Sequence, residues 1–147
     1  MIWLFAALTV LAGALIPLQA GINASLRSHL GHPILAALTN FAVGGAMLVL
    51  FALATRVSLP TLGQLQSAPW WCWLGGTMGA ALVVTGVLFS LKLGAATFVA
   101  CIILGQLTSS VILDHIGAAG YIEHAVNPMR LLGLLLLALG AYFVRAF

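Results

Sequence analysis

Five stretches of about 20 residues each are almost entirely apolar, and only one of them contains a charged residue. A helix needs roughly 20 apolar residues to cross the hydrocarbon core of a bilayer, which is about 30 Å thick. Within lipid the backbone must satisfy its hydrogen bonds internally, and a run of this length does so as an α-helix. We therefore predict a single all-α transmembrane domain, residues 1–147, with helices at about 2–24, 33–55, 69–91, 94–113 and 128–144.

Charged side chains are too rare for a water-soluble fold. The 147 residues include five Lys and Arg and two Asp and Glu, so that 5% are charged and 63% are hydrophobic. A soluble domain is roughly a quarter charged, and a surface with so few charges cannot be solvated by water. The lipid bilayer is therefore the expected environment.

The formal net charge of +3 does not indicate a nucleic-acid-binding protein, because that function needs clustered basic residues. Here the basic residues occur singly at or beside the ends of apolar runs, where long side chains reach the headgroups. They are Arg27, Arg56, Lys92, Arg130 and Arg145. We interpret them as anchoring and topology residues and expect no nucleic acid partner.

Sequence signals for enzyme chemistry are absent. No phosphate-binding loop, nucleophile motif or metal-ligand spacing occurs, and Cys72 and Cys101 both lie inside apolar runs. We expect these cysteines to be small packing residues. The chain is predicted not to be an enzyme and to need no metal or other cofactor.

An odd number of spans places the two termini on opposite faces of the membrane, here called face A for the N-terminal side and face B for the other. Almost no loop separates the third and fourth spans at Lys92 and Leu93, so these spans are predicted to form an antiparallel hairpin. Most of the aromatic residues typical of a membrane interface then lie on face A. They are Trp3, Trp70, Trp71, Trp73 and Tyr121.

The basic residues give almost no orientation signal. Two of them fall on face A, at Arg56 and Arg130, and the other three fall on face B. The positive-inside rule weakly favours face B as the cytoplasmic side, but a difference of one charge does not fix an orientation. Insertion in both orientations is therefore an open alternative.

Small residues recur in the third span at the spacing that lets membrane helices approach closely. Gly75 and Gly79 form one pair four residues apart, Gly76 and Ala80 form a second, and Gly86 follows seven residues after Gly79. We expect these glycines to mediate helix packing. Contacts within one chain and contacts with a second copy both remain open.

Polar side chains within the spans are few, which makes their positions informative. Six of them are candidates for a substrate pathway: Gln19, Asn23, Asn40, Gln106, Ser109 and Ser110. Gln19 and Asn23 are four residues apart, just after Pro17, which is expected to kink the first helix. The alternative is that these groups only hold neighbouring helices together, and the hydroxyl groups in particular can bond to their own helix.

One acid–imidazole pair stands at the end of the fourth span, at Asp114 and His115. We predict it to be a gate or a proton-linked element, with a solvated helix end as the alternative. No carboxylate lies at the centre of any span. This absence favours a neutral or anionic solute over a quaternary cation.

Four ordered blocks resemble the YdcZ-like family of the drug/metabolite transporter superfamily. They are Pro17–Ala24, Pro69–Gly76, Gly105–Gly117 and Asn127–Gly133. The resemblance implies a five-helix half-transporter that works as a dimer, because the family includes dual-topology homodimers, paired heterodimers and fused two-copy proteins.

We therefore expect a multi-pass protein of the bacterial cytoplasmic (inner) membrane that moves a small organic solute by alternating access. Two copies in opposite orientations would form an inverted repeat, an architecture common among secondary transporters. The partner is a second copy of the chain or a homologous protein. The alternatives are a membrane channel and a non-transporting membrane subunit that pairs with a homologous partner.

Overall fold

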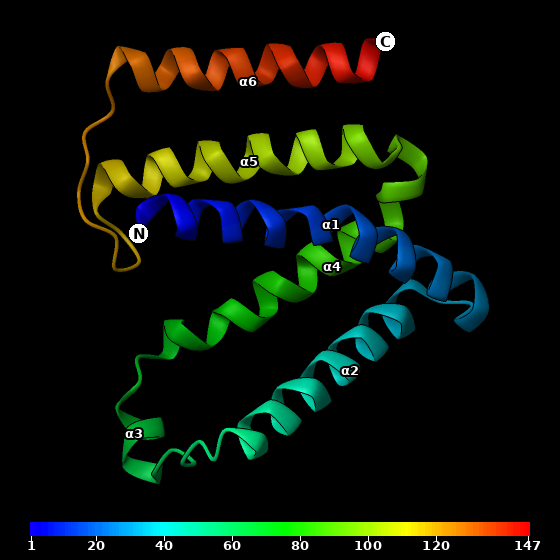
Figure 1. Ribbon diagram of the computed structural model, residues 1–147, viewed down its shortest axis with the longest axis vertical. Helices are drawn as coiled ribbons and strands as arrows, with labels where there is room; N and C mark the ends of the chain where they lie inside the picture. The colour runs from blue at the N-terminus through cyan, green and yellow to red at the C-terminus, as the bar shows by residue number, and fades with distance from the viewer. The chain divides into compact units, whose positions relative to one another are not determined.

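The computed structural model describes residues 1–147 and is entirely helical (Figure 1). Its elements in chain order are α1 (Ile2–Leu30), α2 (Pro33–Ala54), α3 (Leu62–Ser67), the 3₁₀ helix η1 (Trp70–Trp73), α4 (Leu74–Leu93), α5 (Ala95–Ile116) and α6 (Pro128–Ala146). Five helices are long and apolar enough to cross a membrane, with η1 and α4 together counted as one. The prediction of an all-α chain with five such helices is confirmed.

Helix α1 is longer than predicted. The predicted first helix ended at about residue 24, but the helix continues to Leu30 without a break at Pro17. The Ser28 hydroxyl donates to the Ser25 carbonyl at 2.6 Å, and Gly31 ends the helix with φ +73°. Its 29 residues correspond to about 44 Å at 1.5 Å per residue, which exceeds the roughly 30 Å thickness of the hydrocarbon core.

A short helix, α3, lies in the connection that follows α2. The predicted helix ranges left residues 56–68 as the connection between the second and third spans. The Thr61 side chain accepts a hydrogen bond from the Gln64 backbone N–H, and the Thr61 N–H donates to Gln64 Oε1 at 2.8 Å. This reciprocal capping box has the spacing Thr-x-x-Gln, a signal for a helix start that is visible in the sequence.

Proline marks two of the long helices at their first residue. Pro33 begins α2 after the cap His32, and Pro128 begins α6 after the cap Asn127. The missing N–H of proline does not matter in the first turn, where backbone donors have no partner within the helix. Pro69 differs, because it precedes the tryptophan-rich 3₁₀ turn η1 rather than an α-helix.

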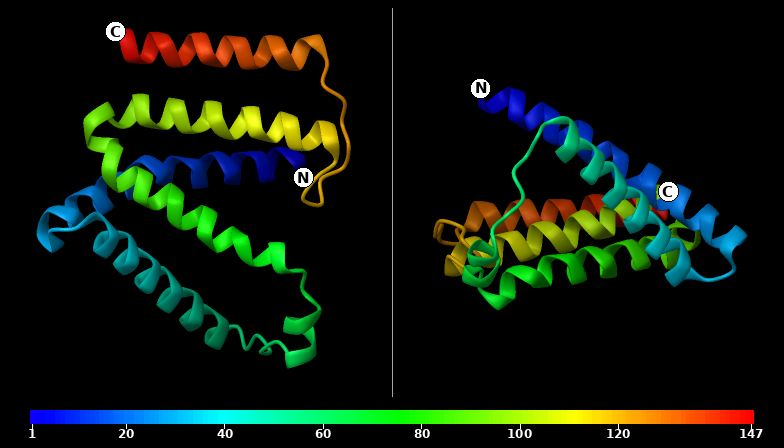
Figure 2. Two further views of the ribbon diagram at one scale, coloured as in Figure 1. Left: turned by 180° about the vertical axis from the view of Figure 1, so that it is seen from behind. Right: turned by 90° about the horizontal axis from the view of Figure 1, so that it is seen from below.

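The chain divides into two compact units, a first unit of residues 1–17 and 93–147 and a second unit of residues 18–92. That the whole chain forms a single transmembrane domain stays a prediction. In the first unit, α5 and α6 run antiparallel and side by side (Figure 2).

Small side chains form the buried part of the second unit. The buried residues come from the second half of α1, the start of α2 and the end of α4, and they are Ala20, Asn23, Ala24, Ala36, Ala37, Gly86, Val87 and Ser90. The Ser90 hydroxyl donates to the Ala20 carbonyl at 3.4 Å, which ties α4 to α1. Small residues of this kind let helix backbones approach closely where lipid removes the hydrophobic drive for association.

The predicted packing glycines of α4 have different surroundings. Gly86 is buried, and a Cβ atom built on Gly79 would lie 3.8 Å from the Phe41 ring of α2. Gly75 and Gly76 have nothing within 4 Å of such an atom. Gly79 and Gly86 therefore belong to contacts within the chain, whereas Gly75 and Gly76 leave an open helix surface.

Gly94 is the only residue between α4 and α5, and its backbone angles are φ +81° and ψ 151°. Because a side chain is strained in this conformation, Gly94→Ala should lower the free energy of unfolding by about 1–3 kcal/mol. An SDS titration followed by circular dichroism measures this change. The control is Gly133→Ala, within α6 and with open space around it, which should keep or slightly raise the stability. An unchanged midpoint for Gly94→Ala would contradict the strained connection.

Candidate solute-binding site

Two amide side chains from neighbouring helices meet in the second unit. Gln19 Nε2 on α1 donates a hydrogen bond to Asn40 Oδ1 on α2 at 3.5 Å, which is long for this type of bond. The short connection at Gly31 and His32 joins α1 to α2. It therefore brings together two residues that lie 21 positions apart in the sequence.

A groove of about 740 Å³ opens beside this amide pair. Apart from Gln19, its lining residues all come from one stretch of α2: Asn40, Phe41, Val43, Gly44, Gly45, Met47, Leu48 and Phe51. Its size is within the range of pockets that hold small organic ligands. Gln19 and Asn40 are its polar side chains, and all the others are apolar.

Asn23 takes a different position from its neighbour Gln19. Its side chain is buried, with 4% of the residue exposed, and the adjacent buried residues on α1 are Ala20 and Ala24. The structure therefore places Asn23 in the packed face of the second unit and not among the residues that line the groove. A pathway role for Asn23 stays a prediction.

The other three predicted pathway residues, Gln106, Ser109 and Ser110, are exposed and lie on α5 in the first unit. The Ser110 hydroxyl donates to the Gln106 carbonyl at 2.8 Å, so its proton is already used within the helix. Ser109 lines a separate groove of about 530 Å³ along α5, together with Cys101, Leu104, Gly105, Thr108, Ile112 and Leu113.

Asp114 forms an ion pair that the sequence analysis did not predict. Its Oδ2 atom lies 3.2 Å from Nη1 of Arg130, and the two side chains are 30% and 31% exposed, respectively. The same Arg130 nitrogen donates to the His124 carbonyl at 3.3 Å, and the His124 N–H donates to the Asp114 carbonyl at 2.7 Å. These bonds connect the end of α5 to the start of α6.

His115 lies beside this ion pair but has another partner. Its Nδ1 atom accepts a hydrogen bond from the Val126 backbone N–H at 3.4 Å. Asp114 and His115 thus each hold part of the α5–α6 connection. The sequence contains a signal for this ion pair. Asp114 is the acid at the end of the fourth predicted span, and Arg130 is the basic residue at the start of the fifth. A gate or proton-linked role stays a prediction.

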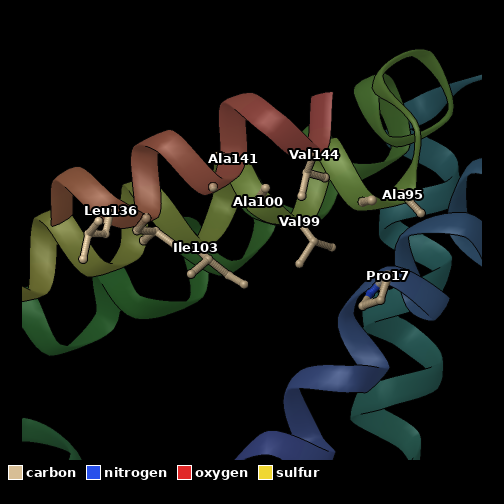
Figure 3. A pocket seen from close by; sticks show the side chains of 11 residues that line it. Pro17, Ala95, Val99, Ala100, Ile103, Leu136, Ala141 and Val144 are labelled. Carbon is tan, nitrogen blue, oxygen red and sulfur yellow. The ribbon is translucent and has the colours of Figure 1, made fainter. Parts of the chain in front are cut away.

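A third groove, of about 590 Å³, runs between α5 and α6 in the first unit (Figure 3). It is lined by Pro17, Ala95, Ala96, Val99, Ala100, Ile103, Leu136, Leu137, Gly140, Ala141 and Val144. None of these side chains can form a hydrogen bond. The groove therefore has no group that would orient a polar solute.

The structure gathers no group of three or more His, Cys, Asp or Glu side chains that would ligate a metal ion. Cys72 and Cys101 are both free thiols. The amide pair and its groove are the candidate site in which polar side chains from two helices meet beside an apolar surface.

A protein-family model described as "Putative inner membrane exporter, YdcZ" matches residues 4–143, which is nearly the whole chain. This match confirms the resemblance found in the four sequence blocks. No curated protein and no solved structure matches the chain.

A double-mutant cycle tests the ion pair between α5 and α6. Asp114→Asn and Arg130→Gln should each lower the stability, and the double variant should lose about 0.5–1 kcal/mol less than the sum, a small coupling because both side chains are partly exposed. As a control, the exchange Asp114→Arg with Arg130→Asp should keep most of the stability. It puts the acid at a helix N-terminus and the base at a helix C-terminus, where the dipole favours each. Additive losses would contradict the pairing.

Proposed function

Because the chain belongs to the YdcZ family of inner membrane exporters, we propose that it exports a small organic solute by alternating access, as a pair of copies in opposite orientations. The chain is a multi-pass protein of the inner membrane. In the proposed pair, the two copies form an inverted repeat around the solute.

The amide pair beside the groove is the observation that supports this proposal most strongly. Gln19 and Asn40 carry polar groups into helices that otherwise present apolar side chains to lipid. Amides at membrane depth are costly unless they have partners or line a cavity, so such residues commonly mark a transport pathway. We assign Gln19 and Asn40 to solute binding, with Asn23, Gln106, Ser109 and Ser110 as further pathway candidates.

Two features support the antiparallel pair. The chain has five spanning helices, an odd number, so an inverted second copy supplies the opposite half of an inverted repeat. The basic residues differ by only one between the two faces, which leaves insertion finely balanced. Gly75 and Gly76, with open space around them, are the proposed contact surface for the second copy.

Reporters fused to each terminus test the orientation. Both reporters should give mixed signals, because the chain inserts both ways. Adding one positive charge to the exposed connection after α2, with Ser58→Lys, should shift the population toward the orientation with face A in the cytoplasm. Ser58→Gln is the matched control and should leave the ratio unchanged. A single orientation that Ser58→Lys does not alter would contradict dual insertion.

Efflux from proteoliposomes, for a solute identified by screening, tests the site. Gln19→Leu and Asn40→Leu should each reduce efflux at least about tenfold, and the double variant should lose little more than the stronger single one, since the two amides act as a unit. Thr85→Val is the control, because the Thr85 hydroxyl donates to the Ala81 carbonyl of its own helix.

Full efflux in both amide variants would contradict the assigned site. Ion conductance far above the turnover of a carrier would favour a channel instead. A purified pair with neither flux nor conductance for any solute would favour the non-transporting subunit.

A further inference from the structure

The amide pair has hydrogen-bonding capacity that its mutual contact does not use. Each primary amide offers two N–H donors and a carbonyl with two lone pairs. The contact between Gln19 and Asn40 uses one donor and one acceptor. Donors and acceptors therefore remain on both side chains for a further partner.

The groove next to the pair is lined mainly by apolar residues. Its α2 lining follows one helix stripe from Asn40 through Gly44 and Met47 to Phe51. These 11 residue steps correspond to about 16 Å along the helix axis. The polar pair lies at one end of this stripe, and Phe51 lies at the other.

Two glycines keep the middle of the groove open. A Cβ atom built on Gly44 or Gly45 would have nothing within 4 Å, and both residues line the groove. A Cβ atom at either position would therefore lie in open space within the groove. Gly44 is thus a position from which a larger side chain would extend into the groove.

No charged side chain lines the groove. An ammonium or carboxylate group bound here would lose its hydration without gaining a counter-ion, which costs several kcal/mol. An uncharged group that both donates and accepts hydrogen bonds would instead pair with the free N–H and carbonyl groups of the amides.

We propose that this groove binds uncharged, elongated solutes that carry a carboxamide-type group at one end and an apolar, preferably aromatic, body. The carboxamide end pairs with Gln19 and Asn40, and the body lies along Gly44 and Gly45 toward Phe51. This proposal rests on the proposed function, since it names the solute class for the same site.

A lipid acyl chain is a less suitable occupant. It fills the apolar length of the groove but offers no hydrogen bond to the amide pair at its end. The polar end of the groove thus favours an amphipathic solute over a hydrocarbon chain.

Equilibrium dialysis with the full-length protein in lipid nanodiscs tests the proposal. Three radiolabelled probes share one skeleton and differ in the end group: 4-phenylbutanamide, 4-phenylbutylamine and 4-phenylbutanoate. At neutral pH the amide is uncharged, the amine is a cation and the carboxylate is an anion. We expect saturable binding of the amide at least about tenfold tighter than that of either charged probe.

Two variants locate the binding. Gly44→Leu should weaken amide binding at least about tenfold by filling the groove, whereas Gly133→Leu, an equally open glycine on α6 outside the groove, should change it less than about twofold. Circular dichroism of both variants verifies folding, since leucine is the better helix former. Asn40→Leu, which keeps the groove apolar, should remove the preference for the amide over the charged probes.

Several results would overturn this assignment. One is that a charged probe binds as tightly as the amide or more tightly. A second is that Gly44→Leu leaves amide binding unchanged. A third is that no probe binds and Gly44→Leu loses co-purified phospholipid. Different outcomes would contradict the proposed function. Saturable amide binding without efflux, or with a single fixed orientation, would reject transport by an antiparallel pair and leave the solute class in place.

Discussion

The structure depends on one constraint, that backbone N–H and C=O groups in lipid must find their partners within the chain. Water is absent from the hydrocarbon core, and long α-helices satisfy this requirement without any neighbouring segment. Once the five helices exist, burial of apolar surface no longer drives them together. Close approach through small residues does so instead, as in the second unit, where Ala20, Ala36 and Gly86 lie in the buried contacts.

The same constraint gives the few polar side chains their importance, and the chain uses them in two ways. Asp114 and Arg130 form an ion pair at the end of a helix hairpin, where partial exposure reduces the cost of charge. Gln19 and Asn40 are uncharged and lie within the helices, where an ionised group would be far more expensive. The first pair connects α5 to α6, and the second supplies the hydrogen-bonding end of an apolar groove.

Local sequence patterns signal parts of the fold that hydrophobic length alone does not. The Thr-x-x-Gln spacing of Thr61 and Gln64 signals the start of α3, and Gly31 signals the true end of α1 better than the polar residues before it. Ser28 and His29 near the end of α1 did not stop the helix, and both side chains lie within hydrogen-bond distance of the Ser25 carbonyl in the same helix. No local sequence pattern indicates that Asn23 is buried. Its burial depends on which helix lies against that face of α1.

By itself, the sequence determined the five membrane helices, the family and the membrane environment, because hydrophobic length and scarcity of charge act along the chain and need no tertiary contact. Only the tertiary structure decided that Gln19 meets Asn40, that Asn23 is buried and that Asp114 pairs with Arg130. These contacts join different helices, and the rotation of each helix about its axis decides which side chains face each other. The hydrophobic pattern of a membrane helix is nearly uniform around that axis, so it contains little information about this rotation.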